Sequence, residues 1–218
     1  MTGTRPLFLA LAFVLINTPL SHAAEPLTIV ALGDSTTAGT PEGNYSQTIS
    51  KLHPEWHVIN SGVNAERTDQ ILKRFESDVL VYHPQVLIVL AGVNDLYQGR
   101  SAEEAEKNLA KIYESAARAN IRVIACTILP YDRSTPDVKA RMKEVNDWIR
   151  AYANQKGLGF CDTYSALEDP ARAGHLIGSP DGLHPDAAAY EKMGHFISKM
   201  LEKEIEKETL VFDKGGIL

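Results

Sequence analysis

The sequence has little cysteine, no cluster of metal-binding side chains and no cluster of basic residues, and each absence excludes a class of protein. Two cysteines in 218 residues are too few for a disulfide-rich small domain, and the cysteines and histidines lack the spacing of zinc or iron sites. The net charge is −6 and lysine or arginine runs are missing, which argues against nucleic acid or an anionic membrane surface as the main partner. We therefore expect one globular domain with no metal centre.

The two cysteines themselves, Cys126 and Cys161, each end or follow a strand-like apolar run. Small buried cysteines are common in protein cores. Export would permit a disulfide between them. The pattern favours two buried core thiols over a disulfide.

Long apolar runs are also absent beyond the first residues. Leu7 to Ile16 is apolar, follows Arg5, and precedes Ser21-His22-Ala23, which has small residues where a signal peptidase needs them. The run is short for a membrane span. We predict a signal peptide over residues 1–23, with an uncleaved anchor as the alternative, and a single domain over residues 24–218. The protein is then expected to be exported, periplasmic or secreted, with no stable membrane insertion after cleavage.

The remaining chain alternates between strand and helix patterns. Buried strands are predicted at 27–33, 56–61, 86–91, 121–129 and 158–161. Amphipathic helices are predicted at 45–52, 67–81, 102–119 and 187–205, with another marked by apolar residues from 138 to 152 that ends at Gly157. This alternation predicts a three-layer α/β/α fold, with a five-stranded parallel sheet in flavodoxin-like order.

Four loops that follow strands or precede the last helix contain polar or glycine residues typical of active sites. They are Gly33-Asp34-Ser35, Asn60-Ser61-Gly62, Gly92-Val93-Asn94-Asp95 and Asp181-Gly182-Leu183-His184-Pro185. In a parallel sheet all four lie at the edge where ligands bind. The loops can therefore contribute to one site.

The residue types in these loops are those of acyl transfer. Ser35 is a nucleophile candidate that needs a base, and His184 can supply it. Asp181, three residues earlier, can accept a hydrogen bond from the imidazole Nδ1–H and orient the ring. The N–H groups of Ser35 and Gly62, with the side-chain amide of Asn94, are predicted to stabilise the oxyanion.

Each feature could be purely structural when taken alone. Ser35 could cap a helix, Gly62 could be a turn residue, Asn94-Asp95 could start a helix, and Asp181-Gly182 could form a tight turn. Their combination, in this order and at strand ends, is far more specific than any single motif.

These blocks resemble those of the SGNH hydrolase superfamily, the GDSL-type lipases and esterases. The serine, glycine, asparagine and histidine that name the superfamily correspond to Ser35, Gly62, Asn94 and His184, and the resemblance covers nearly all of the chain after residue 23. In particular, the sequence is similar to bacterial lysophospholipase and thioesterase-like esterases and to carbohydrate acetylesterases of the same fold, whose activities are the alternative functions. Thr36 stands where many members have leucine. The G-x-S-x-G motif of α/β-hydrolases is absent.

The resemblance implies a serine esterase that forms a covalent acyl-enzyme on Ser35, acts on a small-molecule ester and needs no cofactor. Three other functions are compatible with parts of the same pattern. They are those of an O-acetyltransferase, of a carbohydrate-binding protein with an inactive site, and of a flavodoxin-like nucleotide or flavin binder. The last lacks the glycine spacing and lysine of phosphate-binding loops.

Substrate size is predicted from the loops around the presumed site. They are 40–44, 95–99, 130–136 and 175–181, and their sizeable apolar residues are Leu96, Tyr97, Tyr131, Leu176 and Ile177. A long acyl chain needs more apolar surface than this. We therefore expect short acyl esters of a neutral alcohol, sugars included.

Overall fold

The computed structural model describes residues 26–215, with side chains up to residue 207. The predicted signal peptide therefore lies outside the described residues. The strands are β1 (Thr28–Gly33), β2 (His57–Gly62), β3 (Val86–Leu90), β4 (Arg122–Cys126) and β5 (Gly159–Cys161). All pairs are parallel and the order is β2-β1-β3-β4-β5. This confirms the predicted five-stranded, flavodoxin-like sheet.

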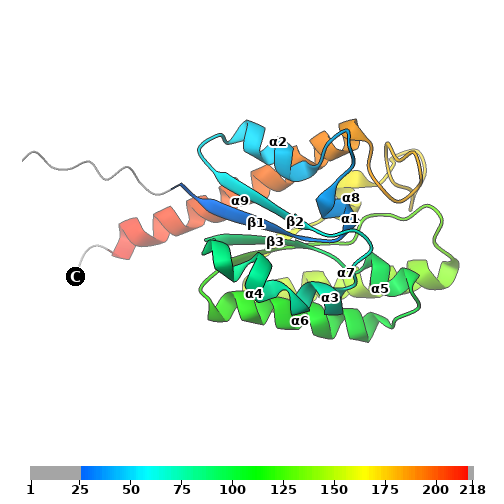
Figure 1. Ribbon diagram of the computed structural model, residues 1–218, viewed down its shortest axis with the longest axis horizontal. Helices are drawn as coiled ribbons and strands as arrows, with labels where there is room; N and C mark the ends of the chain where they lie inside the picture. Colours follow the sequence, from blue (N-terminus) through cyan, green and yellow to red (C-terminus); the bar gives the residue numbers. More distant parts are fainter. Residues whose placement is uncertain (1–25, 216–218) are drawn as a thin grey trace, which may run out of the picture.

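Helices cover both faces of the sheet (Figure 1). One face packs against α2 (Tyr45–Leu52), α8 (Thr163–Leu167) and α9 (Ala187–Gly215). The other packs against α3 (Thr68–Lys73), α4 (Phe75–Asp78), α5 (Val93–Tyr97), α6 (Ala102–Arg118) and α7 (Pro136–Lys156). The short helix α1 (Ser35–Ala38) follows β1 directly. The result is the predicted three-layer arrangement.

Successive side chains of β1 lie on opposite faces of the sheet and pack into the two hydrophobic cores alternately. Val30 and Leu32 belong to the core beneath α6 and α7, whereas Ile29 and Ala31 belong to the core beneath α2 and α9. All four are fully buried. A strand buried on both faces needs apolar residues throughout, which is why the continuous runs of β1 and β3 mark the middle of the sheet.

The helix predicted over 67–81 is instead broken into α3, α4 and a 3₁₀ turn at Leu80–Tyr82. The break lies at Arg74, whose guanidinium donates to the carbonyls of Gly33 and Ser61, each at 2.9 Å. Arg74 also forms ion pairs with Glu66 at 2.6 Å and Asp78 at 2.8 Å. The side chain thus links the carboxyl ends of β1 and β2. The short helices α1, α5 and α8 were also missing from the predicted elements.

Cys126 and Cys161 are free, buried thiols, as predicted. They are register partners on β4 and β5.

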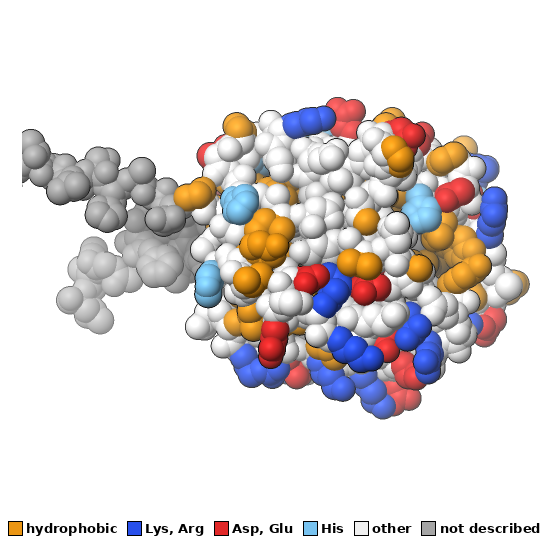
Figure 2. Space-filling view, in the orientation of Figure 1, with side chains coloured by type: hydrophobic (Ala, Val, Ile, Leu, Met, Phe, Trp, Pro, Cys, Tyr) orange, Lys and Arg blue, Asp and Glu red, His pale blue; other side chains and the backbone are white. Residues whose placement is uncertain are grey.

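On the face shown in Figure 2, basic side chains are interspersed with acidic ones. None of the helices in residues 26–215 has the length and apolar character needed to cross a membrane.

Candidate active site

Ser35 lies in the first turn of α1, directly beyond the carboxyl end of β1. Asp34 caps this helix, because its Oδ1 accepts the Thr36 N–H at 2.9 Å. The turn is tight: a Cβ on Gly33 would lie 2.2 Å from Thr37 Oγ1 and 2.3 Å from the Leu90 carbonyl. Glycine at this position therefore allows the chain to turn and present Ser35 at the sheet edge.

Asp181 is held by four donors from its own loop, the weakest being the Ser179 hydroxyl at 3.4 Å from Oδ1. Its Oδ1 accepts the N–H groups of Leu183 at 2.8 Å and His184 at 2.7 Å, and its Oδ2 is 2.6 Å from His184 Nδ1. Partial burial alone would raise the pKa of Asp181, but the hydrogen bonds from His184 and Leu183 hold it well below its usual range. The carboxylate is therefore charged at neutral pH and accepts the imidazole Nδ1–H.

His184 joins this loop to α1. With Nδ1–H donated to Asp181, its Nε2 is free to accept the Ser35 hydroxyl, and the two atoms are 2.8 Å apart. The three side chains form one continuous hydrogen-bonded chain. The structure thus brings together Ser35, His184 and Asp181 with the separations that a nucleophile, its base and an orienting acid require.

Gly62 lies outside the site formed by Ser35, His184 and Asp181, and the predicted role of its N–H as an oxyanion donor is corrected. Its N–H donates to Asn60 Oδ1 at 2.9 Å, and it is not among the residues that line the cleft at Ser35. A Cβ on Gly62 would lie only 2.1 Å from Ala38 N and 2.6 Å from the Thr37 carbonyl carbon. The glycine is needed because β2 packs closely against α1.

Ala65, three residues further on, occupies the position that Gly62 was expected to fill. It lines the cleft together with Ser35, Asn94 and His184. Its φ is +63°, a left-handed conformation that glycine or asparagine usually adopts. Because alanine gives no such signal in a sequence, sequence reasoning missed this residue.

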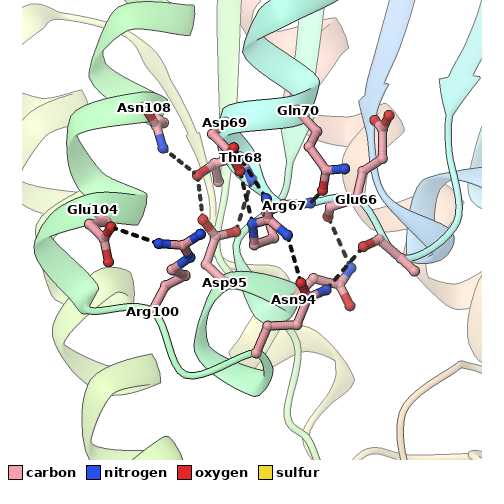
Figure 3. Close-up of polar contacts among 12 residues, drawn as sticks. Glu66, Arg67, Thr68, Asp69, Gln70, Asn94, Asp95, Arg100, Glu104 and Asn108 are labelled. Atoms are coloured by element: carbon pink, nitrogen blue, oxygen red, sulfur yellow. Dashed lines mark hydrogen bonds and ion pairs between the residues drawn. The ribbon is translucent and has the colours of Figure 1, made fainter.

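Asn94 is buried at the start of α5 and lies beside Glu66 (Figure 3). Its Nδ2 donates one hydrogen to the Glu66 carbonyl at 3.1 Å. An amide nitrogen carries two hydrogens, so the second remains for the cleft. Glu66 in turn holds Arg74 through its carboxylate.

Asp95, the next residue, ties α5 to the same loop (Figure 3). Its carboxylate accepts the Thr68 N–H at 2.9 Å and the Thr68 hydroxyl at 2.6 Å, and Asn108 Nδ2 lies 3.1 Å from that hydroxyl oxygen. Burial raises the pKa of Asp95, and the Thr68 hydrogen bonds oppose this rise. The network fixes the position of Asn94 relative to Ala65.

The cleft around Ser35 has a volume of about 530 Å³, which lies in the range of small-molecule sites. It is lined by Ser35, Gly39, Thr40, Pro41, Asn64, Ala65, Asn94, Tyr97, Tyr131, Arg133, Asp181, Leu183 and His184. Two residues expected at its mouth, Leu96 and Leu176, lie in the core instead. The larger apolar side chains that line the cleft are those of Pro41, Tyr97, Tyr131 and Leu183.

Asp34 makes the stability of the fold depend on pH. Burial raises its pKa from 3.8 to about 6, although the Thr36 hydrogen bonds and His184 oppose the rise. The folded protein thus holds this proton more tightly than the unfolded chain, so stability falls as pH rises from about 4 to about 6.

The variant Asp34→Asn keeps the acceptor for the Thr36 N–H but cannot ionise. We expect it to gain roughly 3 kcal/mol relative to wild type between pH 4 and pH 8, measured by urea unfolding. A gain that does not change with pH would contradict this assignment.

The comparisons with known proteins agree with this architecture. The model of the family described as "GDSL-like Lipase/Acylhydrolase family" matches residues 31–192. A solved GDSL-like lipase from Bacteroides thetaiotaomicron is 25% identical, covers 83% of this chain and 92% of its own, and has a TM-score of 0.72. The acetylxylan esterase Axe2 from Geobacillus stearothermophilus is 16% identical, covers 81% and 94%, and has a TM-score of 0.67, a likeness of fold alone.

A curated relative adds a partial match. YqeF of Bacillus subtilis, described as an uncharacterized lipoprotein, is 28% identical over 117 residues, which are 47% of this chain and 48% of that protein. The chain thus spans about half the length of this relative. The family match is much more extensive, since it includes the segments of Ser35, Ala65, Asn94 and His184. The chain therefore belongs to the GDSL-like lipase/acylhydrolase family.

Proposed function

We propose that the protein is a serine esterase that hydrolyses short-chain carboxylic esters through a covalent acyl-enzyme on Ser35. The observation that supports this most directly is the continuous hydrogen-bonded chain from Asp181 through His184 to Ser35 Oγ. A serine hydroxyl is a weak nucleophile unless a base removes its proton. In this proposal His184 is that base, and the charged carboxylate of Asp181 orients it.

The reaction has two halves. Ser35 Oγ attacks the ester carbonyl while its proton passes to His184 Nε2, and the imidazolium then gives that proton to the leaving alcohol as the C–O bond breaks. Water attacks the acyl-enzyme in the second half, its proton passing through His184 to Ser35 as the acid is released. Asp181 stabilises the imidazolium in both halves and keeps its own negative charge.

Three donors are proposed for the oxyanion: the Ser35 N–H, the Ala65 N–H and the second Asn94 Nδ2–H. Amides of a first helical turn have no intrahelical acceptor, which leaves the Ser35 N–H available. Within residues 26–215, the Ala65 N–H has no hydrogen-bond acceptor. Donors fixed before the reaction stabilise the transition state without further reorganisation.

Asn94→Ala tests the oxyanion assignment. Because its amide is expected to bond the developing oxyanion, kcat should fall by roughly 10²- to 10³-fold with little change in KM. The fold should persist, since Asp95 still binds Thr68. Asn108→Ala, which removes an amide from the same network but outside the cleft, serves as the matched control. A change confined to KM would make Asn94 a substrate-binding residue instead.

The preference for short acyl groups is supported by the size of the cleft, about 530 Å³, and by its having only four larger apolar side chains, those of Pro41, Tyr97, Tyr131 and Leu183. Each buried methylene is worth about 0.8 kcal/mol only where apolar surface receives it. The same fold serves an acetylxylan esterase, which adds acetylated carbohydrate as a candidate substrate. We expect kcat/KM for p-nitrophenyl esters to be highest for acetate or butyrate, and to depend on Ser35. An optimum at ten carbons or more would overturn the short-chain assignment.

A further inference from the structure

Arg133 is the positively charged side chain at the cleft that the reaction as described does not use. Of the described residues that line the cleft, Arg133 alone is a lysine or arginine. It sits in a turn closed by the hydrogen bond from Ser134 N to the Tyr131 carbonyl at 3.1 Å. The turn places an aromatic ring, Tyr131, and a guanidinium beside one another at the mouth of the site.

The turn is attached to the loop of the proposed acid and base. Asp132 N–H donates to the Gly182 carbonyl at 2.8 Å, and its Oδ1 accepts the Leu176 N–H at 2.7 Å. A Cβ on Gly182 would lie 3.7 Å from Arg133 Cγ. The stem of Arg133 therefore packs beside Gly182, the residue that follows Asp181.

The guanidinium of Arg133 has no protein partner within residues 26–207. The carboxylates of Asp132, its neighbour in sequence, and of Asp181, in the adjacent loop, interact with other groups. Asp132 Oδ2 lies 3.2 Å from His175 Nδ1, and Asp181 accepts from Leu183 and His184. Other arginines among the described residues form ion pairs with carboxylates, as Arg74 and Arg150 do. An unpaired arginine at the cleft is thus available to a ligand.

The side of the cleft on which Arg133 lies indicates which part of the ester it meets. The leaving alcohol takes its proton from His184 Nε2, so it lies on the side of the loop that carries His184. Arg133 is anchored to that loop through Asp132 and Gly182. Tyr97 and Tyr131, whose ring centroids are 6.0 Å apart in an edge contact, provide an apolar surface next to it.

We propose that Arg133 selects esters whose alcohol portion carries an anionic group, a carboxylate or a phosphate, beside the scissile bond. This rests on the proposed esterase function and replaces the expectation of a neutral alcohol. Arginine suits the task because its planar fork binds both oxyanions through two parallel hydrogen bonds. The short acyl group then occupies the rest of the cleft.

The test compares two acetate esters of nearly equal shape, 4-acetoxybenzoate, which is anionic, and 4-acetoxybenzamide, which is neutral. Wild type should prefer the anionic ester. Arg133→Gln should lower the ratio of kcat/KM for the benzoate to that for the benzamide by about tenfold, because a general loss of activity cancels in this ratio. Raising the salt concentration should lower the ratio in wild type and much less in the variant. 4-Acetoxyphenyl phosphate, measured alongside, identifies whether carboxylate or phosphate is favoured.

Arg118→Gln is the matched control, since it removes the same charge at the end of α6, outside the cleft, and should leave the ratio unchanged. An unchanged ratio in Arg133→Gln, with the benzamide still hydrolysed in a Ser35-dependent manner, would overturn the role of Arg133 and leave the esterase function standing. Failure of wild type to hydrolyse any of the three esters would overturn both proposals.

Discussion

Ser35→Ala is expected to lower kcat for ester hydrolysis by roughly 10⁴- to 10⁶-fold, as loss of a triad nucleophile does in other serine hydrolases. The variant cannot form the acyl-enzyme, whatever the other groups contribute. Steady-state hydrolysis of p-nitrophenyl acetate, with enough enzyme to detect residual turnover, measures the loss.

The fold should be unaffected by this change. The Ser35 hydroxyl bonds His184 Nε2, whereas the helix cap is made by Asp34 and stays in place. Circular dichroism and the unfolding midpoint of Ser35→Ala should therefore match those of wild type. Loss of activity with an intact fold assigns a chemical role to Ser35; retained activity would remove it from the reaction.

Asp181→Asn is expected to lower kcat by about 10⁴-fold at neutral pH with the loop geometry retained. The asparagine Oδ1 can still accept the N–H groups of Leu183 and His184, but its Nδ2 donates where the carboxylate accepted. His184 Nδ1 must then become the acceptor, which places the hydrogen on Nε2 and prevents it from taking the Ser35 proton. The loss thus arises from the wrong tautomer rather than from a lost contact.

Asp147→Asn supplies the charge-matched control for this variant, because Asp147 pairs with Lys143 at an exposed position of α7. It should retain wild-type kcat. If the kcat of Asp181→Asn were less than about tenfold below that of wild type, the carboxylate would not be the group that orients His184. The proposed hydrogen-bonded chain of three residues would then be wrong.

The sheet could be predicted from the sequence because its central strands are buried on both faces. Continuous apolar runs such as those of β1 and β3, in a chain that alternates strands with helices, are typical of the middle of a parallel sheet. The helix over 67–81 was predicted from its apolar spacing alone, which contains no information about Arg74. Its guanidinium binds carbonyls of two strands that are distant in sequence, so the break has a tertiary cause.

The candidate site was predictable in part for a similar reason. Ser35, Asp181 and His184 are of residue types that indicate their chemistry, and the topology brings strand ends together. The proposed backbone donor gave no such indication. Gly62 is of the expected residue type but packs against α1, whereas Ala65, whose N–H has no acceptor among the described residues, adopts a conformation that is rare for alanine. A backbone group leaves a sequence signal only when its conformation demands glycine.

Covalent labelling by a fluorophosphonate, followed by peptide mapping, tests the central claim most directly. An activated Ser35 should react once per chain, with the label on the peptide that contains Ser35 and no labelling of Ser35→Ala. Prior incubation with an ester substrate should slow the reaction. A label on any other residue, or equal labelling of wild type and Ser35→Ala, would contradict the assignment of Ser35 as the nucleophile.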